Sequence, residues 1–318
     1  MKKIVALIHP KAVGYEISQF DRRDDAKFVH FCERTKEAIM DATKDADVFL
    51  YSGAKIDREI LDNMEKCQLI IRYGIGYDDI DYKWAAQKGI MVCNAPNYGV
   101  IDVAEHAVSL LMACSKRLVY MNDCVRDKFW KASVMGSSAR LCGKTVGFIG
   151  FGKIAKCVCT RTNALGMKPI VFDPYVKTGI LDEYCAEQVN LDELLQMADY
   201  VTLHLPLNKE TYHMLDRDAF RKMKRSAYII NTSRGGLINE KDLVEALLNG
   251  EIAGAGLDVF EEESANLDNR FLTMKNVVLT PHVAWNTAEA SASLHKEVTD
   301  NVLRFLDGER PHSIINMK

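Results

Sequence analysis

The stretch that most constrains the fold of this chain covers residues 143–173. An apolar run over residues 145–150 leads into a Gly-x-Gly turn made by Gly150 and Gly152. A helical pattern follows, and a second apolar run ends at Asp173. A strand, a glycine-rich turn, a helix, a strand and an acidic residue in this order predict a βαβ unit that binds a dinucleotide.

Each part of this stretch has a physical reason to be there. Gly150 allows a tight turn, Gly152 lets backbone N–H groups approach a pyrophosphate, and the helix N-terminus adds partial positive charge at the same place. Ala155, at the position of the third glycine, is small enough for close helix–strand packing. Asp173 can accept hydrogen bonds from both ribose hydroxyls and would repel a 2′-phosphate, which favours NAD over NADP. The alternative is a plain βα turn with no ligand.

Alternating strand and helix patterns fill most of the remaining chain. The expected strands cover residues 3–9, 48–51, 68–72, 90–93, 145–150, 169–173, 200–205, 227–231, 253–258, 277–280 and 313–316. The expected helices cover residues 33–43, 57–66, 81–88, 102–127, 153–165, 191–198, 216–223, 239–249 and 287–307. This alternation predicts two α/β domains with parallel sheets. We expect the last helix to rejoin the first domain, which would make that domain discontinuous.

Composition and charge exclude several classes of function. The length of 318 residues suits two domains, and the net charge of −3, without a basic face, argues against a nucleic-acid partner. The nine cysteines show no metal-binding spacing, so we expect reduced thiols in a cytoplasmic protein and no metal site. No apolar run approaches the length of a membrane helix, so we expect no membrane partner.

Three residue types suited to hydride chemistry follow three of the expected strands. Arg234 can hold a carboxylate in a fork, His282 can donate or accept the hydroxyl proton, and Glu263 can orient the imidazole. Each residue also has a simpler interpretation: a surface ion pair for Arg234, a solvated acidic run for Glu263 and a capped loop histidine for His282.

Several spaced motifs, in order from about residue 70 onward, resemble those of the D-isomer-specific 2-hydroxyacid dehydrogenase family. The matching segments are residues 72–78, 103–106, 143–152 and 204–206 with Thr211, followed by residues 233–235, 258–263 and 281–282. His106, which belongs to the second of these motifs, is expected to contribute packing rather than catalysis.

The resemblance implies a role for each matching position. The implied catalytic residues are Arg234, Glu263 and His282. Ser264 stands where the family usually has a proline, which makes the alignment of the three adjacent acids ambiguous, and the spacing from Asp258 favours Glu263. The implied cofactor contacts are Gly150, Gly152, Lys153, Ile154, Asp173, His204, Pro206, Thr211, Thr232, Ser233, Arg234, Asp258, His282 and Trp285. The implied substrate contacts are Tyr73, Gly74, Ile75, Gly76, Arg234 and His282, with the backbone N–H groups of Tyr73 and Gly74 holding the carboxylate. Asp258 is expected near the nicotinamide amide, and Trp285 is expected either to wall a pocket or to pack in the core or an interface.

The family fold implies two doubly wound domains: a Rossmann nucleotide-binding domain, residues 101–288, inserted in a flavodoxin-like substrate domain, residues 1–100 and 289–318. It also implies a cleft between the domains, NAD as cofactor and a homodimer. The expected activity is NADH-dependent reduction of a small 2-keto acid such as hydroxypyruvate or glyoxylate. Two alternatives stay open: a 3-phosphoglycerate dehydrogenase, for which no second basic group can be placed, and a non-enzymatic, NAD(H)-sensing protein that resembles a corepressor.

Overall fold

The computed structural model describes residues 1–8, 19–20, 23–130, 138–177, 179–263 and 270–317. The chain divides into two compact units. Unit 1 contains residues 1–99 and 286–318, and unit 2 contains residues 100–285. The chain therefore leaves unit 1 and returns to it. The predicted domain boundaries, after residues 100 and 288, lie within three residues of the observed unit boundaries, after residues 99 and 285.

Unit 1 is built on a parallel sheet of five strands in the order β2-β1-β3-β4-β5. This order is that of the flavodoxin-like fold. Its strands are β1 (Lys2–Leu7), β2 (Ala26–Phe31), β3 (Val48–Tyr51), β4 (Leu69–Arg72) and β5 (Met91–Cys93). Its helices are α2 (Lys36–Thr43), α3 (Arg58–Asn63), α4 (Tyr82–Gln87) and α11 (Ala288–Leu306). The prediction had no strand at β2, an edge strand in which Lys27 is exposed and the last four residues are only partly buried.

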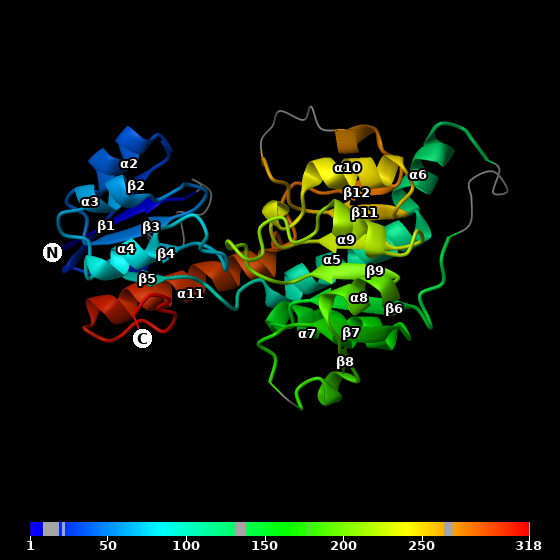
Figure 1. The fold of residues 1–318 in the computed structure, drawn as a ribbon. Helices are drawn as coiled ribbons and strands as arrows, with labels where there is room; N and C mark the ends of the chain where they lie inside the picture. Colours follow the sequence, from blue (N-terminus) through cyan, green and yellow to red (C-terminus); the bar gives the residue numbers. More distant parts are fainter. Residues whose placement is uncertain (9–18, 21–22, 131–137, 178, 264–269, 318) are drawn as a thin grey trace. The chain divides into compact units, whose positions relative to one another are not determined.

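Both faces of the unit 1 sheet are covered (Figure 1). Alternate residues of β1 point to opposite faces, so Ile4 packs in the cluster that contains Leu294 and Val298 of α11. Its neighbour Val5 packs instead in the cluster that contains Ile60 of α3. Helix α11 is thus an integral part of the core of unit 1, although it is the last helix in the sequence.

The predicted C-terminal strand over residues 313–316 is absent from the described structure. Only Ile314 makes an isolated antiparallel bridge, to Cys93. The side chain of Asn316 accepts from the Val92 N–H and donates to the Ile90 carbonyl, so a side chain replaces part of the strand ladder at this edge.

Unit 2 is built on a parallel sheet of seven strands in the order β12-β11-β10-β9-β6-β7-β8. Its strands are β6 (Thr145–Ile149), β7 (Lys168–Phe172), β8 (Glu187–Gln188), β9 (Tyr200–Leu203), β10 (Tyr228–Asn231), β11 (Gly254–Leu257) and β12 (Val277–Leu279). Its α-helices are α5 (Val100–Lys116), α6 (Leu118–Arg126), α7 (Lys153–Ala164), α8 (Leu191–Met197), α9 (Arg217–Lys222) and α10 (Glu240–Leu248). This is the Rossmann strand order with one strand added, and α5 and α7 cover one face while α8, α9 and α10 cover the other (Figure 1).

Two local predictions in unit 2 need comment. The single helix predicted over residues 102–127 is wrong, because Arg117 adopts a left-handed conformation with φ of 53° and separates α5 from α6. The predicted N-cap of the helix at residues 239–249 is confirmed, since the Asn239 side chain accepts from the Asp242 N–H at the start of α10. The short edge strand β8 was not predicted.

Candidate active site

The carboxyl ends of the unit 2 strands meet at one edge of the sheet, because all of the strands are parallel. The strand order reverses between β6 and β9, and ligands of open α/β sheets bind outside such a reversal. The loops after β6, β9, β10, β11 and β12 therefore bring together residues that lie far apart in the sequence. These loops contain every cofactor and catalytic residue predicted in unit 2 apart from Asp173, which follows β7, and Lys153 and Ile154, which begin α7.

The turn after β6 has the geometry that a pyrophosphate needs. Gly150 has φ of 84°, and a Cβ atom on it would lie 2.5 Å from the carbonyl oxygen of His204, so no side chain fits there. Gly152 then caps the N-terminus of α7, whose cap receives no side-chain hydrogen bond. Lys153 and Ile154 begin α7 at this turn, where the helix N-terminus adds the partial positive charge that favours an anion.

Asp173 follows β7 and is anchored beside this turn. One carboxylate oxygen accepts from the Phe151 N–H and the other from the Tyr175 N–H, both at 2.8 Å. These bonds fix the carboxylate next to the glycine turn, and each oxygen has a lone pair left for a ribose hydroxyl. The residues present therefore fit a dinucleotide.

The loop after β9 contributes a neutral histidine. Burial lowers the pKa of His204 to about 3, so its imidazole carries no charge at neutral pH. Its Nε2 lies 2.9 Å from the Thr202 hydroxyl. In the same loop the Thr211 hydroxyl donates to the Pro206 carbonyl, so Thr211 shapes the loop.

The central pair of the site is His282 and Glu263. His282 Nδ1 lies 2.6 Å from Glu263 Oε2, and the two side chains are 37% and 41% exposed, so a substrate can reach them. The pairing with the carboxylate places the proton of Nδ1 between the two groups and leaves Nε2 for chemistry. Ser264, which made the alignment of the acids ambiguous, lies outside the described residues.

The structure distinguishes Glu263 from the other acids of its run. Glu261 accepts from the Glu240 N–H at 2.8 Å and lies 3.2 Å from His213 Nε2. Its own N–H donates to the Glu240 side chain at 2.6 Å. Glu261 therefore joins the loop to the start of α10, while Glu263 turns to His282.

Asp258 shapes the loop that carries His282. Its side chain is fully buried, and its carboxylate accepts from the Thr280 hydroxyl, the Val283 N–H and the Ala284 N–H at 2.5, 3.0 and 2.9 Å. Burial acts to raise the pKa of Asp258, but hydrogen bonds from His106, Thr280 and the two backbone groups outweigh it and hold that pKa below its ordinary value. The expected contact of Asp258 with the nicotinamide amide stays a prediction. The structure adds a second role for Asp258, which is to hold the loop that carries His282.

Arg234 follows β10 in a loop that is held by short hydrogen bonds. The Asn231 side chain donates to the Arg234 carbonyl and accepts from the Ser233 N–H, at 2.8 and 3.0 Å. The Ser233 hydroxyl donates to the Leu203 carbonyl of the neighbouring strand. The buried Thr232 hydroxyl has no hydrogen-bond partner among the described residues. Trp285 is partly buried, and its role stays a prediction.

In unit 1 the predicted carboxylate donors require a correction. The Tyr73 N–H donates to the Tyr51 carbonyl at 2.8 Å, and the Gly74 N–H donates to the Arg72 carbonyl at 3.0 Å, so both groups are already used. Among the described residues no acceptor is found for the N–H groups of Ile75 and Gly76. The backbone donors that remain in this loop are therefore the N–H groups of the next two residues, Ile75 and Gly76.

A tight network holds this loop in place. The Arg72 guanidinium donates to the Tyr73 carbonyl at 2.8 Å and pairs with Asp79 at 3.3 Å. The buried Tyr51 hydroxyl donates to the same Asp79 carboxylate. Gly74 has φ of 141°, and a Cβ atom on it would lie 1.7 Å from Arg72 Nη1. Only glycine adopts this conformation readily, so the loop depends on Gly74.

His106 was expected to contribute packing rather than catalysis, and the structure also gives it polar partners. Its Nε2 lies 2.9 Å from the Thr280 hydroxyl and 3.5 Å from Asp258 Oδ1. The sequence contained no signal for this contact, because α5 and the loop after β12 are separated by more than 170 residues.

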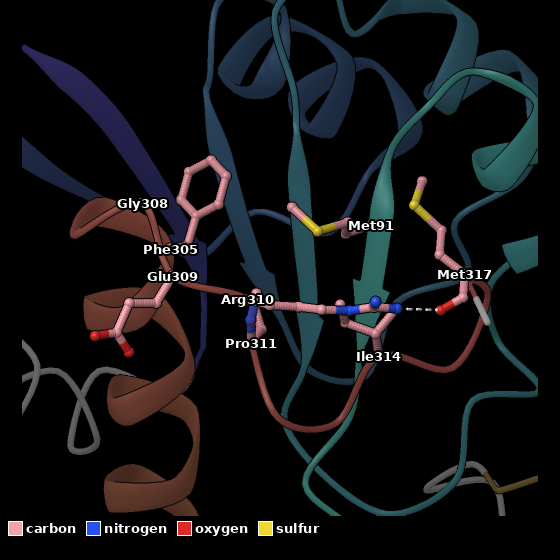
Figure 2. A pocket seen from close by; sticks show the side chains of 8 residues that line it. All are labelled: Met91, Phe305, Gly308, Glu309, Arg310, Pro311, Ile314 and Met317. Carbon is pink, nitrogen blue, oxygen red and sulfur yellow. Dashed lines mark hydrogen bonds between the residues drawn. The ribbon is translucent and has the colours of Figure 1, made fainter.

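A cavity of about 510 Å³ lies in unit 1, and none of these residues lines it. It is lined by Met91, Phe305, Gly308, Glu309, Arg310, Pro311, Ile314 and Met317, and Figure 2 shows Arg310 reaching the carbonyl of Met317. Its walls are mostly apolar and contain no predicted site residue, so we base the functional assignment on the strand-end loops.

Metal ligands and membrane-spanning helices were both considered for the described part of the chain, and it has neither. No group of three or more histidine, cysteine, aspartate or glutamate side chains there is placed to hold a metal ion. None of its helices is both long and apolar enough to cross a membrane.

Comparison with known proteins identifies relatives over nearly the whole chain. Residues 108–284 match the family model of the D-isomer-specific 2-hydroxyacid dehydrogenase NAD-binding domain. A glyoxylate reductase of Korarchaeum cryptofilum is 37% identical over 288 residues, which cover 89% of this chain and 87% of that protein. A D-3-phosphoglycerate dehydrogenase of Methanocaldococcus jannaschii is 39% identical over 285 residues, which cover 89% of this chain. The matched part spans only 54% of that longer enzyme.

A solved structure is similar over its full length. D-lactate dehydrogenase from Aquifex aeolicus, complexed with NAD and lactic acid, superposes with a TM-score of 0.91 at 27% identity, and the match covers 100% of both chains.

Proposed function

Because the chain belongs to the D-isomer-specific 2-hydroxyacid dehydrogenase family of NAD-dependent oxidoreductases, we propose that it reduces a small 2-keto acid to the D-2-hydroxy acid with NADH. The observation that carries this proposal is the 2.6 Å pair between His282 and Glu263 at the edge of a dinucleotide-binding sheet. Arg234 follows β10 of the same sheet. An acid–base group and a carboxylate-binding group are what reduction of a 2-keto acid requires.

Cofactor binding is assigned to the turn after β6 and its surroundings. When bound, NADH supplies the hydride. The N-terminus of α7 would hold the pyrophosphate, and Asp173 would accept hydrogen bonds from the ribose hydroxyls. A 2′-phosphate would meet the charge of the Asp173 carboxylate, which supports NADH over NADPH.

Substrate binding and proton transfer are assigned to side chains of unit 2 and to backbone donors of unit 1. Arg234 binds the substrate carboxylate in a fork and polarises the adjacent carbonyl. His282 Nε2 donates a proton to the carbonyl oxygen as C2 is reduced, and Glu263 stabilises the imidazolium before that transfer. We assign the N–H groups of Ile75 and Gly76 to the same carboxylate, in place of those of Tyr73 and Gly74.

The substrate is proposed from the relatives. A glyoxylate reductase that matches this chain over 87% of its own length favours glyoxylate or hydroxypyruvate. A 3-phosphoglycerate dehydrogenase is the alternative, supported by a relative of which the chain spans about half. A non-enzymatic, NAD(H)-sensing role is the second alternative, and it has no structural observation in its favour.

A substrate panel tests the proposal. Turnover of glyoxylate, hydroxypyruvate, pyruvate and 3-phosphohydroxypyruvate would be followed by NADH absorbance, and each assay would be repeated with NADPH. We expect turnover with at least one of the first two substrates and slower turnover with NADPH. Tight NADH binding without turnover of any member would overturn the enzymatic assignment, and a preference for the phosphorylated acid would favour the alternative substrate.

We also propose that the chain forms a homodimer through α6. This helix has no buried residue, and Leu118, Val119 and Val125 on it are 54%, 46% and 48% exposed. Trp130, shortly after it, is 83% exposed. Apolar surface of this kind marks an interface. Sedimentation should give a dimer that Val125→Asp weakens, whereas a monomeric wild-type protein would contradict the proposal.

The nine free cysteines support a cytoplasmic location.

A further inference from the structure

A chain of hydrogen bonds runs from α5 to the loop that carries His282. It begins at His106 Nε2, which lies 2.9 Å from the Thr280 hydroxyl. It continues from that hydroxyl to Asp258 Oδ1, at 2.5 Å. All three residues belong to unit 2, and Asp258 is fully buried.

The direction of these bonds follows from counting protons. The hydroxyl of Thr280 has one hydrogen, and the Asp258 carboxylate can only accept, so Thr280 donates that hydrogen to Asp258. The Thr280 oxygen must then accept from His106, so Nε2 of His106 carries a proton. His106 is therefore the donor at the start of the chain, and a side chain without an N–H at this position would break it.

The other end of the chain fixes the backbone on both sides of His282. The Asp258 carbonyl accepts from the His282 N–H at 2.7 Å, and its carboxylate accepts from the N–H groups of Val283 and Ala284. Three consecutive N–H groups of the loop thus bind one residue. His282 has φ of 53°, a left-handed conformation that is unfavourable for a residue with a side chain and needs support from its surroundings.

The charged neighbour of His106 on α5 has its partner elsewhere. The neighbouring Glu105 pairs with Arg161 of α7 at 2.9 Å, so its charge is engaged on another face of the helix. The acidic group that faces His106 is Asp258, at 3.5 Å.

We propose that His106 is a positioning residue, which keeps Thr280 and Asp258 in the arrangement that directs His282 toward Glu263. This inference rests on the proposed function, since it concerns the orientation of the acid–base group of that reaction. His106 needs no contact with the substrate or the cofactor to act in this way. His106 acts through Thr280 and Asp258 on the backbone position of residues 282–284, and this position sets the orientation of the His282 side chain.

Two substitutions of His106 separate positioning from packing. Glutamine can place an N–H near the position of Nε2, while leucine has a similar volume without a donor. We expect His106→Gln to keep kcat within about 3-fold of wild type, and His106→Leu to lower it by about 10- to 100-fold, the range for a lost hydrogen bond to a charged network. The dissociation constant of NADH should be unchanged in both variants.

Amide hydrogen exchange provides a readout that does not depend on turnover. The N–H groups of Val283 and Ala284 should exchange faster in His106→Leu and as in wild type in His106→Gln. If His106→Leu fails to fold, a second pair of variants tests the same chain of hydrogen bonds. Thr280→Ser keeps the hydroxyl, and Thr280→Val removes it. Equal kcat and equal exchange in the donor and non-donor variants would overturn the inference. If the wild-type protein reduced no 2-keto acid, the proposed function would fail, and the exchange measurement would still test the network.

Discussion

The two units present different chemical groups at the carboxyl edges of their sheets. In unit 2 the strand-end loops present side chains that contact one another, as His282 does with Glu263 and Thr280 with Asp258. In unit 1 the loop after β4 leaves backbone N–H groups at Ile75 and Gly76, while Arg72 is engaged by the Tyr73 carbonyl and by Asp79. The loops of unit 2 thus contain an imidazole that can transfer a proton, whereas the N–H groups left in this loop of unit 1 can only donate hydrogen bonds.

This difference explains which functional groups could be recognised in the sequence. A reactive side chain has a residue identity, so Arg234, Glu263 and His282 could be selected by type and by position after a strand. A backbone donor has no such identity, and its availability depends on which hydrogen bonds the fold has already formed. The assignment to Tyr73 and Gly74 failed for this reason, because both N–H groups are used inside the chain.

The largest effect is expected at the proton-transferring group of unit 2. His282→Gln should lower kcat by about 10²- to 10⁴-fold, the usual contribution of a general acid or base. NADH affinity should be close to that of wild type, as measured by fluorescence titration. An unchanged kcat would mean that the proton comes from another group. His312, which lies in the C-terminal part of unit 1, provides a matched His→Gln control.

A smaller effect is expected where unit 2 holds the substrate. Arg234→Lys keeps the charge but removes the planar fork, so kcat/KM should fall by about 100-fold. Steady-state kinetics over a range of substrate concentrations would measure this change. A loss below about 3-fold would indicate that a point charge suffices.

In unit 1 the corresponding substitution acts through the backbone. Gly74→Ala would force the loop out of φ of 141° or displace Arg72, so we expect KM to rise by about 10-fold while kcat stays within about 2-fold. Gly89→Ala is the matched control, because Gly89 also has positive φ, of 76°, but a Cβ atom there meets nothing within 4 Å. Equal KM values for the two variants would refute the role of the loop.

The smallest effect concerns stability and its dependence on pH. The pKa of Asp258 is lowered in the folded protein, so this residue stabilises the fold above the unfolded pKa of about 3.9, and that contribution is lost as the pH falls through the lower folded value. Asp258→Asn should therefore lose roughly 1 kcal/mol relative to wild type at pH 7 and progressively less below about pH 4. Urea unfolding at several pH values would test this, with Asp24→Asn as a control at an exposed position. A difference that grows toward low pH would contradict the assignment.

The elements that were predicted best are strands whose continuous apolar sequence indicates that they are buried. The strands at β3, β6 and β10 are continuous apolar runs buried inside their sheets, and their predicted bounds agree with the structure to within one residue. The strand at β2 lies at a sheet edge with Lys27 exposed, so its pattern did not stand out. The break at Arg117 interrupts an apolar periodicity that continues on both sides, and no glycine or proline marks it.

In the candidate site, too, the sequence revealed residue types and their order but not the contacts between residues. The type and order of Glu263 and His282 could be predicted, but the choice among three adjacent acids required their hydrogen bonds. The contact of His106 with Thr280 depends on how α5 packs across the ends of the strands, which is a tertiary property. Sequence reasoning therefore selected candidate reacting groups by residue type and missed the contacts that hold them in place.

The division of roles between the units can be measured in one experiment. Single-turnover oxidation of NADH by a saturating 2-keto acid would be followed by stopped flow for wild type, His282→Gln and Gly74→Ala. We predict that His282→Gln is slower by at least about 100-fold at every substrate concentration, whereas Gly74→Ala approaches the wild-type rate once substrate saturates. A Gly74→Ala rate that stays low at saturation, or a His282→Gln rate that recovers there, would contradict the account.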